Sequence, residues 1–227
     1  HDALPILWVW DTETLKIITP NEKPIILGQM LDILFTQDNQ YIITNSNQYG
    51  IELWDVNAGD KFGELLLNGK TAENIYRMAL RPDGQMLAGS DYDGNLYYWD
   101  LATLKLLFQV NNTGEDGLFT DIAFHPNSQY LFSVDEEAIK YWSGFDGKFM
   151  GILQDANRST NMVLPIDRLL ISPDGALLVW GSTDGNIKMW EIYKHFKTRD
   201  PFYPYSGLGS GLAYSPDGKL LAATGKD

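Results

Sequence analysis

Hydrophobic and polar positions alternate in short blocks along the chain, and turn residues separate the blocks. The clearest block covers residues 81–100, where Pro-Asp-Gly at 82–84 precedes an apolar run over Gln85–Ser90. Proline presets φ, aspartate bonds its own backbone and glycine accepts a positive φ, so this tripeptide indicates a tight turn. Asp-Gly at 93–94 is a hairpin signal, and an aromatic run over Asn95–Trp99 follows it. The block therefore predicts a turn, a strand, a second turn and another strand.

The same block recurs along the chain with a nearly constant period. The tryptophans that end the aromatic runs are separated by 44, 45, 43 and 48 residues, by subtraction of residue numbers. The second positions of the turns are separated by 45, 44, 47 and 43 residues. These markers are Trp10, Trp54, Trp99, Trp142 and Trp190 for the runs, and Asp38, Asp83, Asn127, Asp174 and Asp217 for the turns. A period of about 40–50 residues is typical of four-stranded propeller blades, so the pattern predicts an all-β chain with five repeat units.

The motifs Ser-Pro-Asp-Gly, Gly-Ser-x-x-Gly and Trp-Asp at these positions resemble the WD-repeat β-propeller family over nearly the whole chain. The resemblance implies a β-propeller of four-stranded antiparallel blades, with residues 1–227 as a single domain. We expect the last blade to be composite, with Leu212–Ser215 and Leu220–Thr224 beside Ile6–Trp10 and Leu15–Thr19 from the other terminus. The alternative is that the chain is part of a larger, seven-bladed propeller.

Each complete repeat is expected to contribute four strands, from the innermost to the outermost. The expected strands are Met30–Thr36, Tyr41–Ser46, Ile51–Trp54 and Phe62–Leu67; Ile75–Arg81, Met86–Ser90, Asn95–Trp99 and Leu104–Val110; Phe119–His125, Tyr130–Val134, Ala138–Trp142 and Lys148–Leu153; and Ile166–Ser172, Leu177–Gly181 and Asn186–Trp190. The third strands are apolar on both faces, which indicates sheets that are covered on both sides. The repeat tryptophans would then be wedges between blades, each burying about 150–250 Å².

The resemblance also implies a hydrogen-bonded chain that joins the tryptophan to a strand hydroxyl and to a turn aspartate six residues before it. The matching positions are Asp93, Ser90 and Trp99 in one repeat and Asp184, Ser182 and Trp190 in another. The Gly-His dipeptide that completes the chain in the family is absent from every repeat. We therefore expect the network to be incomplete and packing to define the blade geometry.

One register of the innermost strands carries alternating charges. Its members are Asp32, Arg77, Asp121 and Arg168. The innermost strands of a propeller line its central channel, so neighbouring opposite charges could pair and hold the blades in register. The second interpretation places these residues on a partner-binding face, with Arg77 and Arg168 as anchors, because arginine is favoured at interface hot spots.

The segment over residues 193–205 departs from the repeat and takes the place of a fourth strand and its following loop. It is basic and aromatic within an acidic chain, which predicts a contact site for an acidic or peptide partner. Its candidate residues are Lys194, Lys197, Arg199, Phe202, Tyr203 and Tyr205. The alternative is a packed excursion that covers the edge of the blade.

Composition narrows the partner class. The net charge of −13 and the absence of a basic stripe disfavour nucleic acids and anionic membrane surfaces. No apolar window approaches the roughly 18 residues of a membrane-spanning helix. The chain has no cysteine, which removes disulfides, thiolate zinc sites and cysteine nucleophiles. The compartment stays open, with a soluble, cytoplasmic protein slightly favoured.

Catalytic and metal-binding patterns are missing from the sequence. It contains no nucleophile elbow or phosphate loop, and Asp91, Asp93 and Asp100 do not have calcium-loop spacing. We therefore expect no catalytic residues, no cofactor and no metal. The leading hypothesis is a non-catalytic protein–protein interaction scaffold, in some cases a subunit of a larger complex, that binds a protein or peptide through propeller-face loops. The alternatives are a propeller enzyme or small-ligand binder that uses the channel, and a structural subunit or fragment of a larger multidomain protein.

Overall fold

The regular structure of the chain is β-strand wherever it is described. The computed structural model describes residues 6–17, 25–26, 29–111, 118–135, 138–155, 166–182, 187–192, 197–198 and 211–224. No helix in these residues is long and apolar enough to cross a membrane. The chain forms two compact units, one of residues 1–92 and 97–109 and the other of residues 93–96 and 110–227.

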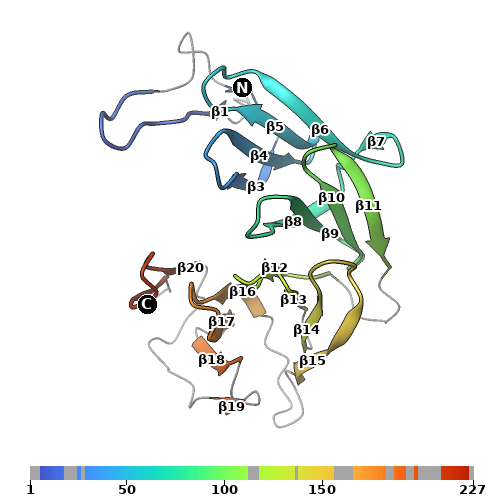
Figure 1. The fold of residues 1–227 in the computed structure, drawn as a ribbon, viewed down its shortest axis with the longest axis vertical. Coiled ribbons are helices and arrows are strands. Elements are labelled where there is room, and N and C mark those ends of the chain that lie inside the picture. The colour runs from blue at the N-terminus through green and yellow to red at the C-terminus, as the bar shows by residue number, and fades with distance from the viewer. Residues whose placement is uncertain are drawn as a thin grey trace. The chain divides into compact units, whose positions relative to one another are not determined.

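The first unit contains two antiparallel sheets built from consecutive strands (Figure 1). One has the order β3-β4-β5-β6-β7, and the next has β8 to β11 in order from one edge to the other. The strands are β3 Met30–Phe35, β4 Tyr41–Ser46, β5 Gly50–Asp55, β6 Lys61–Leu67, β7 Lys70–Thr71, β8 Ile75–Leu80, β9 Met86–Asp91, β10 Leu96–Asp100 and β11 Lys105–Val110. Near the N-terminus, β1 (Ile6–Leu7) pairs with β2 (Ile25–Ile26), and Trp10 forms an isolated bridge with Ile17.

The second unit repeats this plan. Two four-stranded sheets run β12-β13-β14-β15 and β16-β17-β18-β19, and β20 pairs with β21. The strands are β12 Asp121–Phe124, β13 Tyr130–Val134, β14 Ala138–Ser143, β15 Phe149–Asp155, β16 Ile166–Ile171, β17 Leu177–Ser182, β18 Ile187–Glu191, β19 Lys197–Thr198, β20 Gly211–Tyr214 and β21 Leu221–Thr224. Within each unit, the innermost strands of successive sheets lie side by side: β3 with β8, β12 with β16 and β16 with β20.

The repeated turn between the first two strands of a sheet has a local cause. At the turn between β16 and β17, the Ser172 hydroxyl donates to Asp174, and the Asp174 carboxylate accepts the N–H of Ala176 at 3.0 Å. Gly175 adopts a φ of +73°, which suits glycine. Thr36 and Ser215 bond their turn aspartates in the same way, which explains why the motif recurs.

Apolar side chains from neighbouring sheets meet between them. In the first unit, Ile43, Ile51, Leu53 and Leu65 of one sheet cluster with Ile75, Met78, Leu87 and Trp99 of the next. In the second unit, Phe132, Val134 and Ile139 cluster with Leu169, Leu178, Trp180 and Trp190. Within each unit, the facing surfaces of two neighbouring sheets therefore cover one another.

The sequence-based prediction of an all-β chain of four-stranded antiparallel sheets is confirmed. Three short strands depart from the expected elements, and the first is Ile25–Ile26, which pairs with Ile6–Leu7. Lys70–Thr71 adds a fifth strand, β7, through a tight hairpin in which Gly69 has a φ of +76°. Lys197–Thr198 pairs with Trp190 and Glu191, so the fourth sheet has an outer strand where the sequence indicated an interruption.

Candidate partner-binding surfaces

The repeat tryptophans find different hydrogen-bond acceptors. The Trp54 indole donates to the Thr44 hydroxyl at 3.0 Å, and the Trp142 indole donates to the Ser133 hydroxyl at 2.8 Å. Trp99 instead donates to the carbonyl of Leu66 in the neighbouring sheet, at 3.1 Å. An indole therefore closes a bond within its own sheet in two repeats and joins two sheets in a third.

The remaining predicted structural residues lie in varied surroundings. The Ser90 hydroxyl is buried and, among the described residues, has no hydrogen-bond partner. Trp190 is buried in the core of the second unit, whereas Trp10 is 55% exposed. Asp93 lies exposed in the turn between β9 and β10. Asp184 and the side chain of Ser182 are outside the described residues.

The two aspartates of the charged register bond to the backbone of the next sheet. A carboxylate oxygen of Asp32 accepts the N–H of Met78 at 3.1 Å, and one of Asp121 accepts the N–H of Leu169 at 2.9 Å. In both receiving strands the pairing register shifts shortly before this N–H, between Ile75 and Arg77 in β8 and between Ile166 and Arg168 in β16. Both β8 and β16 are edge strands of their sheets, and the carboxylate of the preceding sheet supplies an acceptor for an N–H on that edge.

We predict that replacing Asp32 with alanine lowers the free energy of unfolding by about 1–3 kcal/mol, because the N–H of Met78 loses a charged acceptor. Urea unfolding followed by far-UV circular dichroism measures this change. Asp60, which is exposed, gives the matched control, and its replacement with alanine is expected to change stability by less than about 0.5 kcal/mol. Equal effects of the two substitutions would contradict the proposed contribution of the bond between the sheets.

The arginine of the same register in β8 forms a cluster with two tyrosines, which we call the Arg77 cluster. The Arg77 guanidinium lies 4.1 Å from the centre of the Tyr76 ring, and one of its nitrogens donates to the Tyr76 hydroxyl at 3.2 Å. The rings of Tyr76 and Tyr92 are 5.1 Å apart. Arg77 is buried, whereas Tyr92 is 47% exposed in the turn after β9. Tyr92 is therefore the accessible side of this cluster.

The other predicted partner-binding residues are less completely described. Arg168 is half-buried in β16, and Lys197 is in β19, where its backbone pairs with Glu191. Five residues of the basic, aromatic segment are outside the described residues: Lys194, Arg199, Phe202, Tyr203 and Tyr205. The prediction that this segment contacts a partner stays a prediction.

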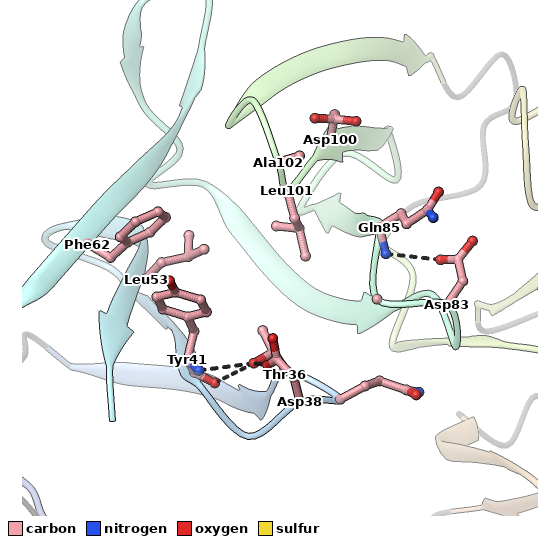
Figure 2. A pocket seen from close by; sticks show the side chains of 12 residues that line it. Thr36, Asp38, Tyr41, Leu53, Phe62, Asp83, Gln85, Asp100, Leu101 and Ala102 are labelled. Atoms are coloured by element: carbon pink, nitrogen blue, oxygen red, sulfur yellow. Dashed lines mark hydrogen bonds between the residues drawn. The ribbon is translucent and has the colours of Figure 1, made fainter. Parts of the chain in front are cut away.

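A groove between the two sheets of the first unit was not anticipated from the sequence. It has a volume of about 550 Å³ and lies where three turns and the start of β6 converge (Figure 2). Its lining residues are Thr36, Gln37, Asp38, Tyr41, Leu53, Phe62, Asp83, Gly84, Gln85, Asp100, Leu101 and Ala102. We call it the β3–β11 groove. The only indication of this groove in the sequence is Phe62, an aromatic residue near the start of the outer strand β6. Its side chain is 54% exposed.

Hydrogen bonds keep the aspartates of the groove ionised. The hydroxyl of Thr36 and the N–H of Gln40 lower the pKa of the Asp38 carboxyl, and the hydroxyl and N–H of Thr103 lower that of Asp100. Partial burial acts to raise the pKa of Asp83, but bonds from Arg81 and Gln85 outweigh it, and the pKa of Asp83 is lowered too. The stabilisation from a lowered carboxyl pKa is present above the unfolded value, near 3.8, and is lost as the pH falls through the folded value.

A second hollow lies on the β12–β15 sheet. It has a volume of about 570 Å³, and exposed Phe145, Phe149 and Met150 form much of its wall.

In the described part of the chain, no group of three His, Asp or Glu side chains is arranged to hold a metal ion.

Comparison with known proteins shows which family the repeats resemble. The WD40 family (WD domain, G-beta repeat) matches residues 64–100 and 164–191. The target of rapamycin complex subunit wat1 of Schizosaccharomyces pombe is 22% identical over 207 residues, covering 88% of this chain and 62% of that protein. The small ribosomal subunit protein RACK1z of Oryza sativa is 32% identical over 122 residues, covering 52% of this chain and 35% of that protein.

A solved structure supports the same fold. The β-propeller domain of Cps50 (Swd1) from Myceliophteria thermophila superimposes with a TM-score of 0.76 at 16% identity, covering 91% of this chain and 65% of that one. The chain thus spans less than two thirds of the length of these relatives. The four-stranded sheets, the adjacent innermost strands, the family match and this structural neighbour agree: the chain contains WD40 repeats and is similar in fold to WD-repeat β-propeller proteins.

Proposed function

We propose that this chain is a non-catalytic protein-interaction scaffold that binds a protein or peptide partner through the loops at one face of its sheets. Two of its relatives are named as components of assemblies, a target of rapamycin complex subunit and a small ribosomal subunit protein. The observation that carries the proposal is the Arg77 cluster, in which an exposed tyrosine lies against a tyrosine–arginine pair.

Arginine and tyrosine suit such a role. Both are enriched among residues that dominate binding energy at protein interfaces. The contact with the Tyr76 ring fixes the Arg77 side chain before any partner arrives, and the bond that the Met78 N–H donates to Asp32 fixes the backbone next to it. A side chain that is already ordered loses less conformational entropy on binding. The Arg77 cluster therefore has the composition and the rigidity of an interface anchor.

We predict that replacing Tyr92 with alanine lowers the recovery of the principal partner at least about tenfold, because the exposed part of the anchor is removed. The tagged chain is used to capture proteins from an extract of its own source cells, and bound proteins are quantified by mass spectrometry. Replacing Tyr49, another exposed tyrosine in the turn of the preceding sheet, is the matched control. A partner recovered equally with both variants would show that the Arg77 cluster does not carry the interaction.

A further inference from the structure

We propose that the β3–β11 groove binds a basic peptide segment carrying one bulky apolar side chain. This site uses the ends of the strands at the turns after β3, β8 and β10, whereas Tyr92 of the Arg77 cluster lies in the turn after β9. The inference rests on the proposed role in protein interaction and names a second contact site with its partner chemistry.

The apolar walls of the groove are the reason to expect a bulky apolar side chain in the bound peptide. Leu53, Phe62 and Leu101 contribute to its walls, and the rings of Tyr41 and Phe62 are 4.6 Å apart. Figure 2 shows Leu101 between Phe62 on one side and Gln85 on the other. Pockets of about 300–1,000 Å³ are typical of small-ligand sites, so a space of about 550 Å³ can hold a large side chain and its neighbouring backbone.

The negative charge of the groove is the reason to expect basic residues in the bound peptide. The Asp83 carboxylate is paired with the Arg81 guanidinium at 2.9 Å, which balances its charge. Asp38 and Asp100 accept hydrogen bonds from neutral hydroxyl and backbone donors, so they keep net negative charge at neutral pH. A lysine or arginine on either side of the apolar residue would meet these carboxylates. The net charge of −13 of the whole chain would attract the same partner from a distance.

The second unit shows why the groove is open in the first. His125 occupies the repeat position of Thr36, and its Nε2 lies 2.9 Å from the carbonyl of Gly175 in the next sheet. Because its Nδ1 accepts the N–H of Asn127, the Nε2 is the protonated nitrogen and donates to that carbonyl. The imidazole thus ties the two turns together. At the corresponding place in the first unit, the Thr36 hydroxyl bonds within its own turn, to Asp38 and to the carbonyl of Tyr41.

This comparison supplies variants that alter the groove and preserve the turn. Thr36→His introduces the residue that ties the second unit's turns and is expected to close the groove. Asp38→Asn removes one charge and keeps the turn, because Asn127 at the equivalent position accepts the N–H of Gln129 at 2.9 Å. Phe62→Ala removes the exposed ring without introducing a new side chain. The matched controls are Phe149→Ala and Asp217→Asn, at a similarly exposed phenylalanine and a turn aspartate of the second unit.

The test uses a phage-displayed library of random 12-residue peptides selected on the wild-type chain. We expect enriched peptides to contain an aromatic or large aliphatic residue flanked by lysine or arginine. Fluorescence anisotropy with the synthetic peptides is expected to show binding at least about tenfold weaker for Thr36→His and Phe62→Ala. Asp38→Asn is expected to weaken binding about threefold to tenfold, and added salt should weaken it further. Both control variants should bind like the wild type.

Several outcomes would overturn this inference. Enriched peptides without basic residues, peptides unaffected by both Thr36→His and Phe62→Ala, or no enrichment at all would each do so. Peptides that lose binding only on replacement of Tyr92 would overturn the groove and leave the proposed function standing. Self-association of the chain that Thr36→His abolishes would assign the groove to a second copy instead. Circular dichroism of each variant verifies that it is folded.

Discussion

Replacing Trp99 with alanine is expected to lower the free energy of unfolding by about 3–5 kcal/mol. The indole is fully buried at the centre of the first unit's core, and its N–H bonds the carbonyl of Leu66 in the neighbouring sheet. Gly89 leaves room for it, since a side-chain carbon there would lie 3.0 Å from the indole ring. Alanine would leave a cavity between two sheets and a carbonyl without its donor. Urea unfolding followed by far-UV circular dichroism measures the loss.

Two further variants separate the contribution of the buried ring from that of the indole N–H and from the general effect of removing a tryptophan. Trp99→Phe keeps most of the buried ring and removes the indole N–H, so its cost should be clearly smaller than that of alanine. Trp10→Ala removes the same side chain from a position where it is 55% exposed, and a change below about 1 kcal/mol is expected there. Equal losses at positions 99 and 10 would be incompatible with Trp99 as the wedge between two sheets.

The second large effect is expected at Lys140. Its ammonium lies 2.8 Å from a carboxylate oxygen of Asp135, and both side chains are less than one tenth exposed. Replacing Lys140 with methionine would leave the buried carboxylate without this counter-charge, and removing one partner of a buried ion pair costs about 3–5 kcal/mol. The same urea titration measures the effect.

A double variant distinguishes the pair from simple packing. The other carboxylate oxygen of Asp135 accepts the N–H of Ala138 at 2.7 Å, and asparagine can keep that bond. We expect Lys140→Met combined with Asp135→Asn to recover most of the stability that Lys140→Met alone loses. Lys148→Met, at an exposed lysine, should change stability by less than about 0.5 kcal/mol. Additive losses in the double variant would exclude coupling between the two charges.

The local parts of the fold follow from local sequence. Ser172, Asp174 and Gly175 form their turn from hydrogen bonds and a backbone angle that lie within a few residues, and Thr36 and Ser215 repeat the arrangement. The sequence could therefore predict the turns, the strands and their order. The period between tryptophans then predicts that the sheets repeat, because each turn fixes where the next strand begins.

The contacts between sheets depend on residues far apart in the sequence. Asp32 accepts the N–H of Met78 because the neighbouring sheet places the edge strand β8 beside it, a long-range contact that no pattern of polar and apolar residues indicates. Trp99 donates to the carbonyl of Leu66 rather than to a strand hydroxyl, and this partner depends on how the two sheets pack against each other. The β3–β11 groove lies where one repeat has threonine at the position that His125 occupies in another, and this difference could be interpreted only once the contact of His125 with Gly175 was seen.

Three of the bonds that cross between sheets run from a side chain of one repeat to the backbone of the next repeat. Asn45 donates to the carbonyl of Ile75, Asp32 accepts from Met78 and Asp121 accepts from Leu169, and each bond joins one repeat to the repeat that follows it. A repeat emerging from the ribosome would thus find its docking partner already present in the segment made just before it. A destabilising substitution in one repeat should therefore destabilise its immediate neighbour and have little effect on repeats further along the chain, as in a linear array of repeats.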